Sequence, residues 1–293
     1  MAWARLDLLI GGLAMGGVYS LVALGFAMII RATGILHFAQ GEVLMIGAMV
    51  GLFASMMLPV PMPVVLVVGM LASAVLAAAL EFFVYRTLRE RGVPNMNIVT
   101  ATLGVSITLA NAARLMWGAE PIRYPDLFST TGYEIGAVRI APQLLWIMIL
   151  SVFLMGLLQA FLRWTRTGIM MRAVAQDPQA AQLMGANLVR SRVMTFAVGG
   201  ALAGAAGVML GSMFYAYFEM GFVTGIKGFV AATLGGLGSI GGAMAGGILF
   251  GLIETYGAVF ISSAYKDAIG MGLLILILLA FPSGLAGMLR GRS

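Results

Sequence analysis

Apolar residues form long uninterrupted runs along the chain, separated by short stretches that contain most of its charges. The clearest runs cover residues 8–30, 63–80, 144–162 and 269–289. Each is close to the roughly 20 residues that an α-helix needs to cross the hydrocarbon core of a bilayer. The pattern therefore predicts an all-α polytopic membrane protein.

Apolar length and loop residues together divide the chain into successive candidate spans. They cover residues 8–30, 42–58, 63–85, 97–117, 142–164, 192–215, 222–238, 241–260 and 267–288. Glycines interrupt the apolar pattern repeatedly between residues 222 and 258, which is typical of two short or broken helices. We therefore expect eight or nine transmembrane helices.

Composition limits the number of domains. The chain is 61% hydrophobic and 10% charged, whereas a soluble domain carries about 25% charged residues. The longest polar interval, residues 120–139, is only long enough for a loop. We expect a single transmembrane domain over residues 1–293, surrounded by membrane lipid.

The distribution of charge predicts the topology. The net charge of +6 comes from short basic clusters between apolar runs, as in cytoplasmic loops, and not from a surface that would bind nucleic acid. These clusters lie in residues 86–91, 163–192 and 290–292, so we place those segments and the C-terminus in the cytoplasm. Residues 120–139 have no basic excess and are placed outside, and nine crossings then put the N-terminus outside. The first apolar run lacks a clear small-residue cleavage site, which indicates a retained span.

Small residues are abundant, with 40 glycines, and cysteine is absent. In lipid, glycines let helix backbones approach closely and so supply packing energy. We expect this role for the glycines of two spans, namely Gly11, Gly12, Gly16, Gly17, Gly199, Gly200, Gly204 and Gly207. Without cysteine there is no disulfide or thiolate metal ligand, and we predict no metal site.

The basic segment of residues 165–192 contains a short helix of its own. Asp177 is a good N-cap, Pro178 suits the first helical turn, and Gly185 can end the helix in a left-handed conformation. This helix would offer Ala180, Ala181 and Leu183 to a partner. Taken alone, the same pattern also fits a helix held on the membrane surface by its flanking arginines.

The spacing within this helix resembles the EAA-x-x-x-G loop of bacterial ABC import permeases, where a short cytoplasmic helix docks in a groove of the ATPase subunit. Residues 179–185 read QAAQLMG, with Gln179 in the place of Glu. The resemblance implies an ATPase-coupling loop at about residues 165–192. The coupling residues that it implies are Arg172, Asp177, Ala180, Ala181, Gly185, Asn187 and Arg190.

Two other segments resemble the LivH-type permeases of branched-chain amino-acid ABC importers. Residues 32–42 read ATGILHFAQGE, similar to a first-loop signature whose common form is Asn-Phe-Ala-His-Gly-Glu; here His37 and Gln40 take the Asn and His places. Residues 225–243 read GIKGFVAATLGGLGSIGGA, similar to a late glycine-rich block of the same family. With the coupling segment, these matches cover the chain nearly end to end and in order.

The resemblance implies a complex in the bacterial inner membrane. It would contain two permeases, two ATP-binding subunits and a periplasmic solute-binding protein, the second permease being a LivM-like chain or a second copy of this one. ATP and Mg would bind on the ATPase partners, and this chain would need no cofactor of its own. Branched-chain amino acids are the expected cargo, with urea, short amides and other small solutes left open.

Polar residues at membrane depth mark a candidate pathway, because they are costly there unless they face a cavity or a partner. Glu42 either caps the helix that it opens or lines the pathway, and Lys227 either binds a carboxylate or, as we favour, lies at the outer water interface. Glu254 is expected to make an interhelical contact, and Glu81 to extend toward the cytoplasmic surface near Arg86. The candidate pathway residues are Phe38, Gln40, Glu42, Asn97, Thr100 and Lys227.

Enzyme chemistry finds little support in the sequence. Residues 236–241 read GLGSIG and fit the dinucleotide fingerprint, but they lie between membrane segments, and no Walker-type phosphate loop is present. His37 is the only histidine, so we predict no catalytic residue. The competing class is a secondary transporter or channel that works alone. The coupling segment argues against it, because such a transporter has no motor to engage.

Overall fold

The computed structural model describes residues 2–57, 60–125, 133–135, 138–260 and 262–280. Its α-helices are α1 (Ala2–Thr33), α2 (Gln40–Met57), α3 (Met62–Ala79), α4 (Arg86–Glu90), α5 (Asn95–Trp117), α6 (Pro142–Trp164), α7 (Arg166–Gln176), α8 (Pro178–Leu183), α9 (Leu188–Met213), α10 (Met220–Gly235), α11 (Ile240–Phe260) and α12 (Lys266–Ala280). A π-helical segment, Leu80–Tyr85, joins α3 to α4, and a 3-10 turn, Ser263–Tyr265, precedes α12. Strands β1 (Tyr133–Ile135) and β2 (Val138–Ile140) pair antiparallel.

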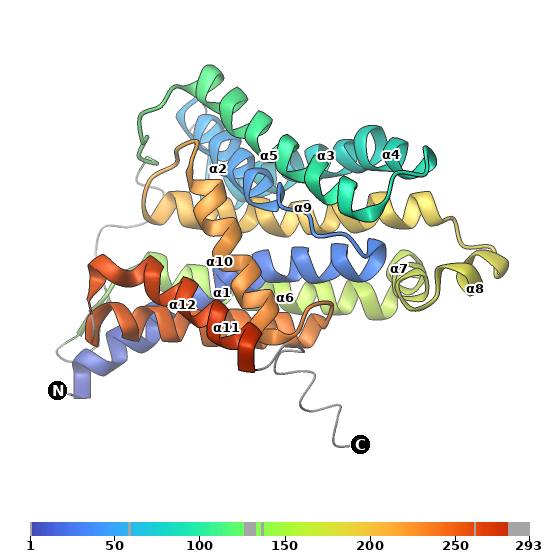
Figure 1. Cartoon of the computed structure of the whole chain (residues 1–293). Helices are drawn as coiled ribbons and strands as arrows, with labels where there is room; N and C mark the ends of the chain where they lie inside the picture. Colours follow the sequence, from blue (N-terminus) through green and yellow to red (C-terminus); the bar gives the residue numbers. More distant parts are fainter. Residues whose placement is uncertain (1, 58–59, 126–132, 136–137, 261, 281–293) are drawn as a thin grey trace.

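The helices form an elongated bundle whose long members run roughly side by side (Figure 1). Within the described residues, seven helices are long and apolar enough to cross a membrane, and the 16-residue α10 is a shorter apolar helix. Together with α12, these helices lie where the nine spans were predicted. The predicted all-α polytopic fold is confirmed. The part of the last predicted span beyond residue 280, with Arg290 and Arg292, lies outside the described residues.

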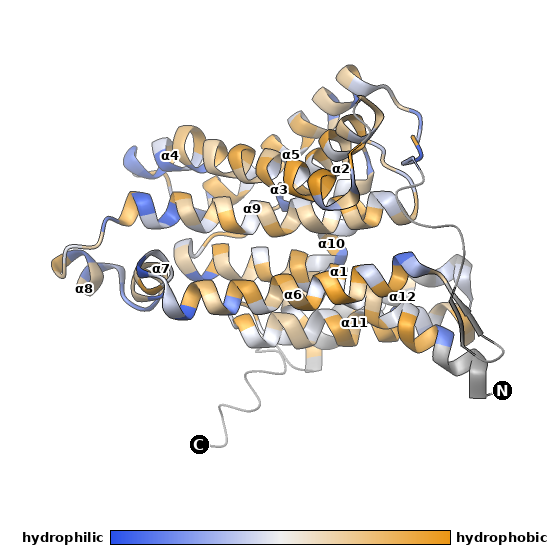
Figure 2. Ribbon diagram, turned by 180° about the vertical axis from the view of Figure 1, so that it is seen from behind, coloured by the Kyte–Doolittle hydropathy of each residue, from blue (hydrophilic) through white to orange (hydrophobic). Residues whose placement is uncertain are grey.

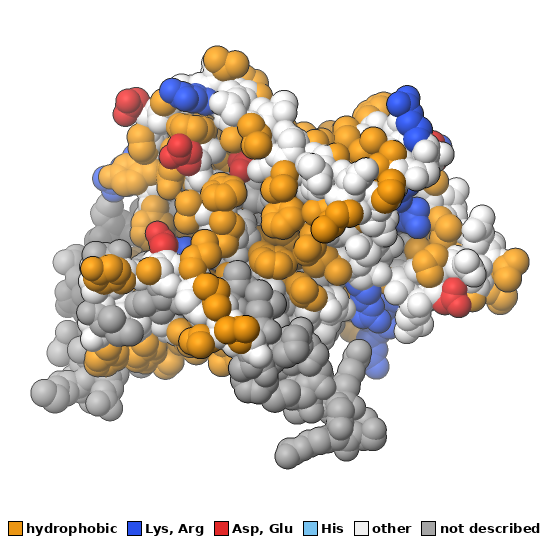
Figure 3. All heavy atoms as spheres, viewed as in Figure 1, with side chains coloured by type: hydrophobic (Ala, Val, Ile, Leu, Met, Phe, Trp, Pro, Cys, Tyr) orange, Lys and Arg blue, Asp and Glu red, His pale blue; other side chains and the backbone are white. Residues whose placement is uncertain are grey.

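Helices α1 and α9 form the centre of the bundle. α1 packs against α6, α9, α10 and α11, while α9 also packs against α2 and α3. By contrast, the spans formed by α3–α4, α5 and α6 bury less than a third of their residues inside the chain. Apolar side chains cover the middle of the face shown in Figure 3, as expected for a surface that meets lipid or partner helices.

The glycines of α1 and α9 explain how these helices approach so closely. A Cβ added at Gly16 would lie 2.8 Å from the Cα of Ile248 in α11, and one at Gly204 would lie 2.6 Å from the carbonyl oxygen of Gly69 in α3. The packing role predicted for these glycines is therefore confirmed. It is wrong for Gly11, where an added Cβ would meet nothing within 4 Å.

The two ends of the bundle differ in polarity. One end carries α4, α7 and α8, and we call it the α8 end; the other carries the β1–β2 hairpin, and we call it the hairpin end (Figure 1). Figure 2 shows the most hydrophilic stretches of helix at α4, α7, α8 and the start of α9. The predicted basic clusters of residues 86–91 and 163–192 thus share the α8 end, which is consistent with their shared placement in one compartment.

The link between α1 and α2 does not stay at the end of the bundle. Figure 1 shows the chain turning back after α1, so that α2 begins part way along the bundle. His37 and Ala39 in this link are fully buried, and the N–H of Phe38 donates to Thr102 Oγ1 of α5 at 3.1 Å. Irregular backbone at membrane depth is tolerated where protein covers it. The sequence did not predict this return into the bundle.

Candidate functional site

The start of α8 is fixed by its N-cap. Asp177 Oδ1 accepts hydrogen bonds from the N–H groups of Gln179 (2.9 Å) and Ala180 (3.0 Å). Pro178 occupies the first turn, where its missing N–H costs nothing. The cap predicted for Asp177 is confirmed.

The end of α8 is fixed by Gly185. Its φ of +87° is left-handed, a conformation that a side chain disfavours. The N–H of Gly185 donates to the carbonyl oxygen of Gln182, and the N–H of Ala186 to that of Ala181, both at 2.9 Å. These two bonds form the Schellman motif that closes helices at glycine. A helix of under two turns thus has a defined boundary at each end.

The tip of α8 exposes two large apolar side chains. Leu183 and Met184 are each 89% exposed, and α8 lies at the extremity of the molecule (Figures 1 and 2). Ala180 is also exposed, but Ala181 is only 7% exposed and packs inward. The expectation that Ala181 faces a partner is therefore corrected, since in this chain Leu183 and Met184 make up the outward apolar surface.

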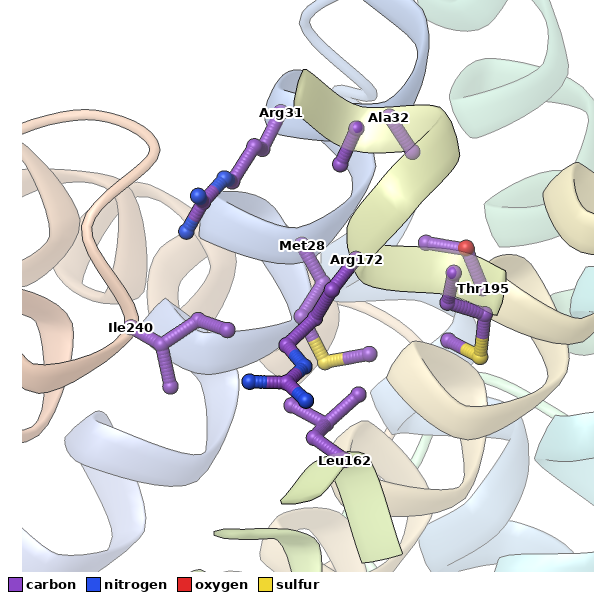
Figure 4. A pocket seen from close by; sticks show the side chains of 9 residues that line it. Met28, Arg31, Ala32, Leu162, Arg172, Thr195 and Ile240 are labelled. Carbon is purple, nitrogen blue, oxygen red and sulfur yellow. The ribbon is translucent and has the colours of Figure 1, made fainter. Parts of the chain in front are cut away.

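The other predicted coupling residues flank α8. Asn187 caps α9 by accepting from the N–H of Arg190 at 2.9 Å, and both side chains are exposed. Arg172 of α7 lines a small pocket of about 20 Å³ between the ends of α1, α6, α9 and α11, together with Arg31 and Met28. Figure 4 shows the side chains of both arginines extending along this pocket. Arg172 therefore lies at the junction of α7 with the bundle and not beside the tip of α8.

A second candidate site lies where α2 and α10 begin. A Cβ added at Gly225 would lie 2.9 Å from the Cα of Gly41, and one at Gly221 would lie 2.6 Å from Glu42 Oε2. The backbones of α2 and α10 are thus in contact within the first two turns of each helix. We call this contact the α2–α10 crossing, made by Gly41, Gly221 and Gly225.

Three of the predicted pathway residues gather at this crossing. Gln40 is fully buried and its Nε2 donates to the carbonyl oxygen of Gly199 at 3.0 Å. Glu42 is 1% exposed, and its Oε1 accepts from Ser106 Oγ at 3.2 Å, so this bond goes to α5 and not to the backbone of its own helix. The ring of Phe38 lies 6.3 Å from that of Phe229 in α10, between ring centroids. Glutamine, glutamate and aromatic groups therefore meet at one closed point in the bundle.

Asn97 and Thr100 do not reach the crossing. Both are exposed on α5, whose side toward the crossing carries Thr102 and Ser106 instead. The exposed face continues through Gly104, Thr108 and Asn111, at intervals of three or four residues. Residues at that spacing share one side of a helix. We call the set Asn97, Thr100, Gly104, Thr108 and Asn111 the α5 polar stripe.

Lys227 also lies apart from the crossing. Its Nζ is 2.6 Å from Glu254 Oε1 in α11 and 2.7 Å from Asp267 Oδ1 in α12. The Lys227 side chain is 14% exposed and that of Glu254 is 1% exposed. Lys227 is thus largely buried and ion-paired, but its partner Asp267 is 70% exposed, so its placement at the outer water interface stays a prediction. The interhelical contact predicted for Glu254 is confirmed.

Glu81 is buried in the π-helical segment and forms an ion pair with Arg89. Arg86 instead pairs with Glu90, at 2.7 Å between Nε and Oε1. The expectation that Glu81 extends toward the surface near Arg86 is therefore corrected. A buried carboxylate can be retained here because a cation lies beside it.

His37 packs between aromatic rings. Its ring centroid lies 5.3 Å from that of Tyr85 and 5.2 Å from that of Phe196. Neither ring nitrogen has a hydrogen-bond partner in the described structure. Among the described residues, no group of three or more His, Asp or Glu side chains is placed to hold a metal ion.

Comparison with known proteins identifies the family. The family model described as "Branched-chain amino acid transport system / permease component" matches residues 8–278. The chain is 36% identical over 296 residues to the high-affinity branched-chain amino acid transport system permease protein LivH of Escherichia coli K12, covering 96% of this chain and 95% of that one. The same identity and coverage relate it to BraD, the corresponding permease protein of Pseudomonas aeruginosa.

A more distant relative is the ribose import permease protein RbsC of Haemophilus influenzae, 24% identical over 92% of this chain and 83% of that one. These relatives are permeases of transport systems and do not support the alternative of a transporter that works alone. The chain belongs to the family of permease components of branched-chain amino acid transport systems.

Proposed function

We propose that this chain is one transmembrane subunit of an ATP-driven importer that carries branched-chain amino acids across the bacterial inner membrane. The cargo is inferred from the relatives named for branched-chain amino acids, which are 36% identical over nearly the whole chain. The ribose permease is related at only 24% identity, so cargo changes across the wider set of relatives. Urea and short amides remain the competing cargoes for an uptake assay to exclude.

The exposed tip of α8 is the observation that supports an ATPase on a separate protein. Leu183 and Met184 are 89% exposed on a helix capped at both ends, an arrangement that a lone chain in water would not favour. A groove on an ATP-binding subunit would cover them, as in other helix-in-groove contacts. ATP and Mg would then bind on the two ATPase subunits, and α8 would transmit their movement to the bundle.

The topology follows from the same proposal. The α8 end faces the cytoplasm, which agrees with its concentration of arginines. The hairpin end then faces the periplasm, where a solute-binding protein would deliver cargo. An odd number of crossings places the N-terminus outside and the C-terminus, which lies beyond the described residues, in the cytoplasm.

The pathway is proposed to lie between this chain and a second permease, either LivM-like or another copy. Thr100 and Thr108 donate their hydroxyls to carbonyl oxygens one turn earlier in α5, at 3.2 and 2.8 Å, whereas the exposed amide of Asn97 is costly against lipid and favours contact with a partner or with water. Gln40 and Glu42 are buried at the α2–α10 crossing, as in a closed state of the pathway. Separation of α2 from α10 would expose them to cargo.

The decisive experiment removes the apolar tip of α8. The double variant Leu183→Ser/Met184→Ser should insert normally, because neither side chain packs within the chain. Co-purification with the ATPase subunits and ATP-dependent leucine uptake should each fall at least about tenfold, as expected when a central apolar anchor is lost. Uptake competition by urea and by acetamide in the unaltered transporter tests the cargo.

The matched control changes an adjacent, comparably exposed pair at the hairpin end, Leu115→Ser/Met116→Ser. This variant should keep its ATPase subunits. Normal ATPase binding and uptake by the Leu183/Met184 variant would refute the docking role of α8.

A further inference from the structure

Two adjoining cavities open between α4 and the start of α9 at the α8 end. Each measures about 380 Å³, and Arg86, Asn187 and Val189 line both. The inner cavity is also lined by Arg89 and Arg192, and the outer one by Arg190. We call the two cavities together the arginine groove, defined by Arg86, Arg89, Arg190 and Arg192.

The arginine groove has more positive than negative charge. Four arginines line it, against two glutamates, Glu81 and Glu90, and both glutamates belong to the inner cavity. Arg86 and Arg190 line the outer cavity, whose lining contains no carboxylate, although Arg86 Nε is also held by Glu90 Oε1 at 2.7 Å. A guanidinium presents several N–H donors in a fork that matches phosphate oxygens.

Two buried donors of the groove are also unused. Arg89 Nη1 and Arg192 Nε are buried and have no hydrogen-bond partner in the described structure, and the same holds for one acceptor of the inner cavity, Glu81 Oε2. Buried donors without partners are costly, and an oxyanion seated among them would satisfy them. Charge and hydrogen-bond supply thus both favour an anionic ligand.

The outer cavity has an apolar wall on the side nearer the middle of the membrane spans. Phe82 lies four residues before Arg86, and Met194 lies four residues after Arg190, so each apolar side chain is one helical turn deeper than its arginine. Both side chains are exposed and line the cavity. The Arg86 guanidinium lies 5.1 Å from the centroid of the Phe82 ring, which holds it at this boundary.

The arginines lie nearer the membrane surface and the apolar side chains lie deeper, which matches the charged headgroup and the acyl chains of a phospholipid. Basic pockets between membrane helices on the cytoplasmic side bind phospholipid headgroups for this reason. We propose that the arginine groove binds the phosphate headgroup of one anionic phospholipid, with an acyl chain along Phe82 and Met194. An acidic residue of an ATPase subunit could approach the arginines, but it would leave the deeper apolar wall uncovered.

The bound headgroup would also touch the coupling segment. Gln182, Ala186 and Asn187 line the inner cavity, so a lipid there would brace the base of α8 against α4. This inference rests on the proposed placement of the α8 end at the cytoplasmic surface of the membrane. It does not depend on the cargo or on the docking of α8.

The test measures lipid binding to the purified full chain in detergent by native mass spectrometry. The chain is titrated with phosphatidylglycerol or with phosphatidylcholine of the same acyl length. We expect phosphatidylglycerol to bind about tenfold more tightly, and Arg86→Gln/Arg190→Gln to abolish this preference, since each arginine near the surface contributes about fivefold. Arg86→Lys/Arg190→Lys should retain part of it.

The control variant is Arg163→Gln/Arg166→Gln, which removes two exposed arginines at the same end but outside the groove. It should bind phosphatidylglycerol as the unaltered chain does. Thermal unfolding midpoints in phosphatidylcholine should agree among all variants, because the substituted side chains are not in the core.

Four outcomes would overturn the proposal. They are no preference for phosphatidylglycerol in the unaltered chain, an equal loss in the control variant, complete displacement of the lipid by millimolar inorganic phosphate, and release of the lipid when the ATPase subunits assemble. The third would identify a site for free phosphate, and the fourth a contact for the ATPase.

Discussion

At the scale of single residues, the sequence predicted those roles that depend on near neighbours. Asp177 and Gly185 act on backbone groups within five residues of themselves, so their types and spacing were sufficient. The inward packing of Ala181 depends on how α7 and α8 fold together, and no local rule contains that information. The same limit applies to Glu81. Its ion-pair partner is Arg89, and the π-helical segment between the two residues helps to set which side chains lie together.

The cap of α8 gives a local prediction. Asp177→Ala should destabilise α8 by about 1 kcal/mol, because two N–H groups lose their acceptor. Amide hydrogen exchange at Gln179 and Ala180 should become roughly fivefold faster. Asp177→Asn keeps an acceptor oxygen and should exchange at nearly the native rate. Equal exchange in Asp177→Ala and the native chain would show that the bundle, and not the cap, holds α8.

Close helix approach gives a second residue-level prediction. A Cβ at Gly47 would lie 2.5 Å from the Cα of Gly204 and from Ser73 Oγ, so Gly47→Ala should separate α2, α3 and α9. We expect a loss of about 1–3 kcal/mol in the free energy of unfolding, seen as a lower thermal midpoint in detergent. Gly156→Ala is the control, because nothing lies within 4 Å of its added Cβ. A lower midpoint in the control would point to a general intolerance of alanine.

At the scale of helices, the sequence predicted where the spans lie, because bilayer thickness sets their length and lipid sets their composition. It did not predict that residues 34–39 turn back into the bundle. A polar-spotted link looks the same whether water or protein covers it, and only the packing of α5 and α9 around His37 and Gln40 distinguishes the two. For the same reason, the sequence did not predict which side of α5 faces into the bundle.

The ion pairs of Lys227 give a prediction at this scale, since they join α10, α11 and α12. Lys227→Met would leave Glu254 buried without this cation, at a cost of about 3 kcal/mol. The thermal midpoint should fall, and adding Glu254→Gln to that variant should recover part of the loss. Lys227→Arg should stay close to the native midpoint. A native midpoint for Lys227→Met would show that the three helices are held by packing alone.

At the scale of the whole molecule, the candidate pathway residues fall into two groups that one chain does not join. Gln40 and Glu42 are closed inside the bundle, while Asn97 and Thr100 face outward on α5. The sequence could identify both groups by their polarity in apolar surroundings. It could not separate them, because which side of a helix faces inward depends on packing. A pathway completed by a second permease accounts for both positions.

The absence of cysteine allows a direct test of that arrangement. Single variants Thr100→Cys and Thr108→Cys place a thiol on the α5 polar stripe, and Val75→Cys places one on an exposed apolar position of α3. In the assembled transporter, a charged, membrane-impermeant maleimide should label the stripe in inside-out or right-side-out vesicles, because a hydrated pathway admits the reagent. It should not label Val75→Cys, since a thiol in lipid remains protonated and inaccessible. Leucine with the binding protein should slow labelling of the stripe. If neither stripe position reacts in either kind of vesicle, α5 packs dry against its partner and the pathway lies elsewhere.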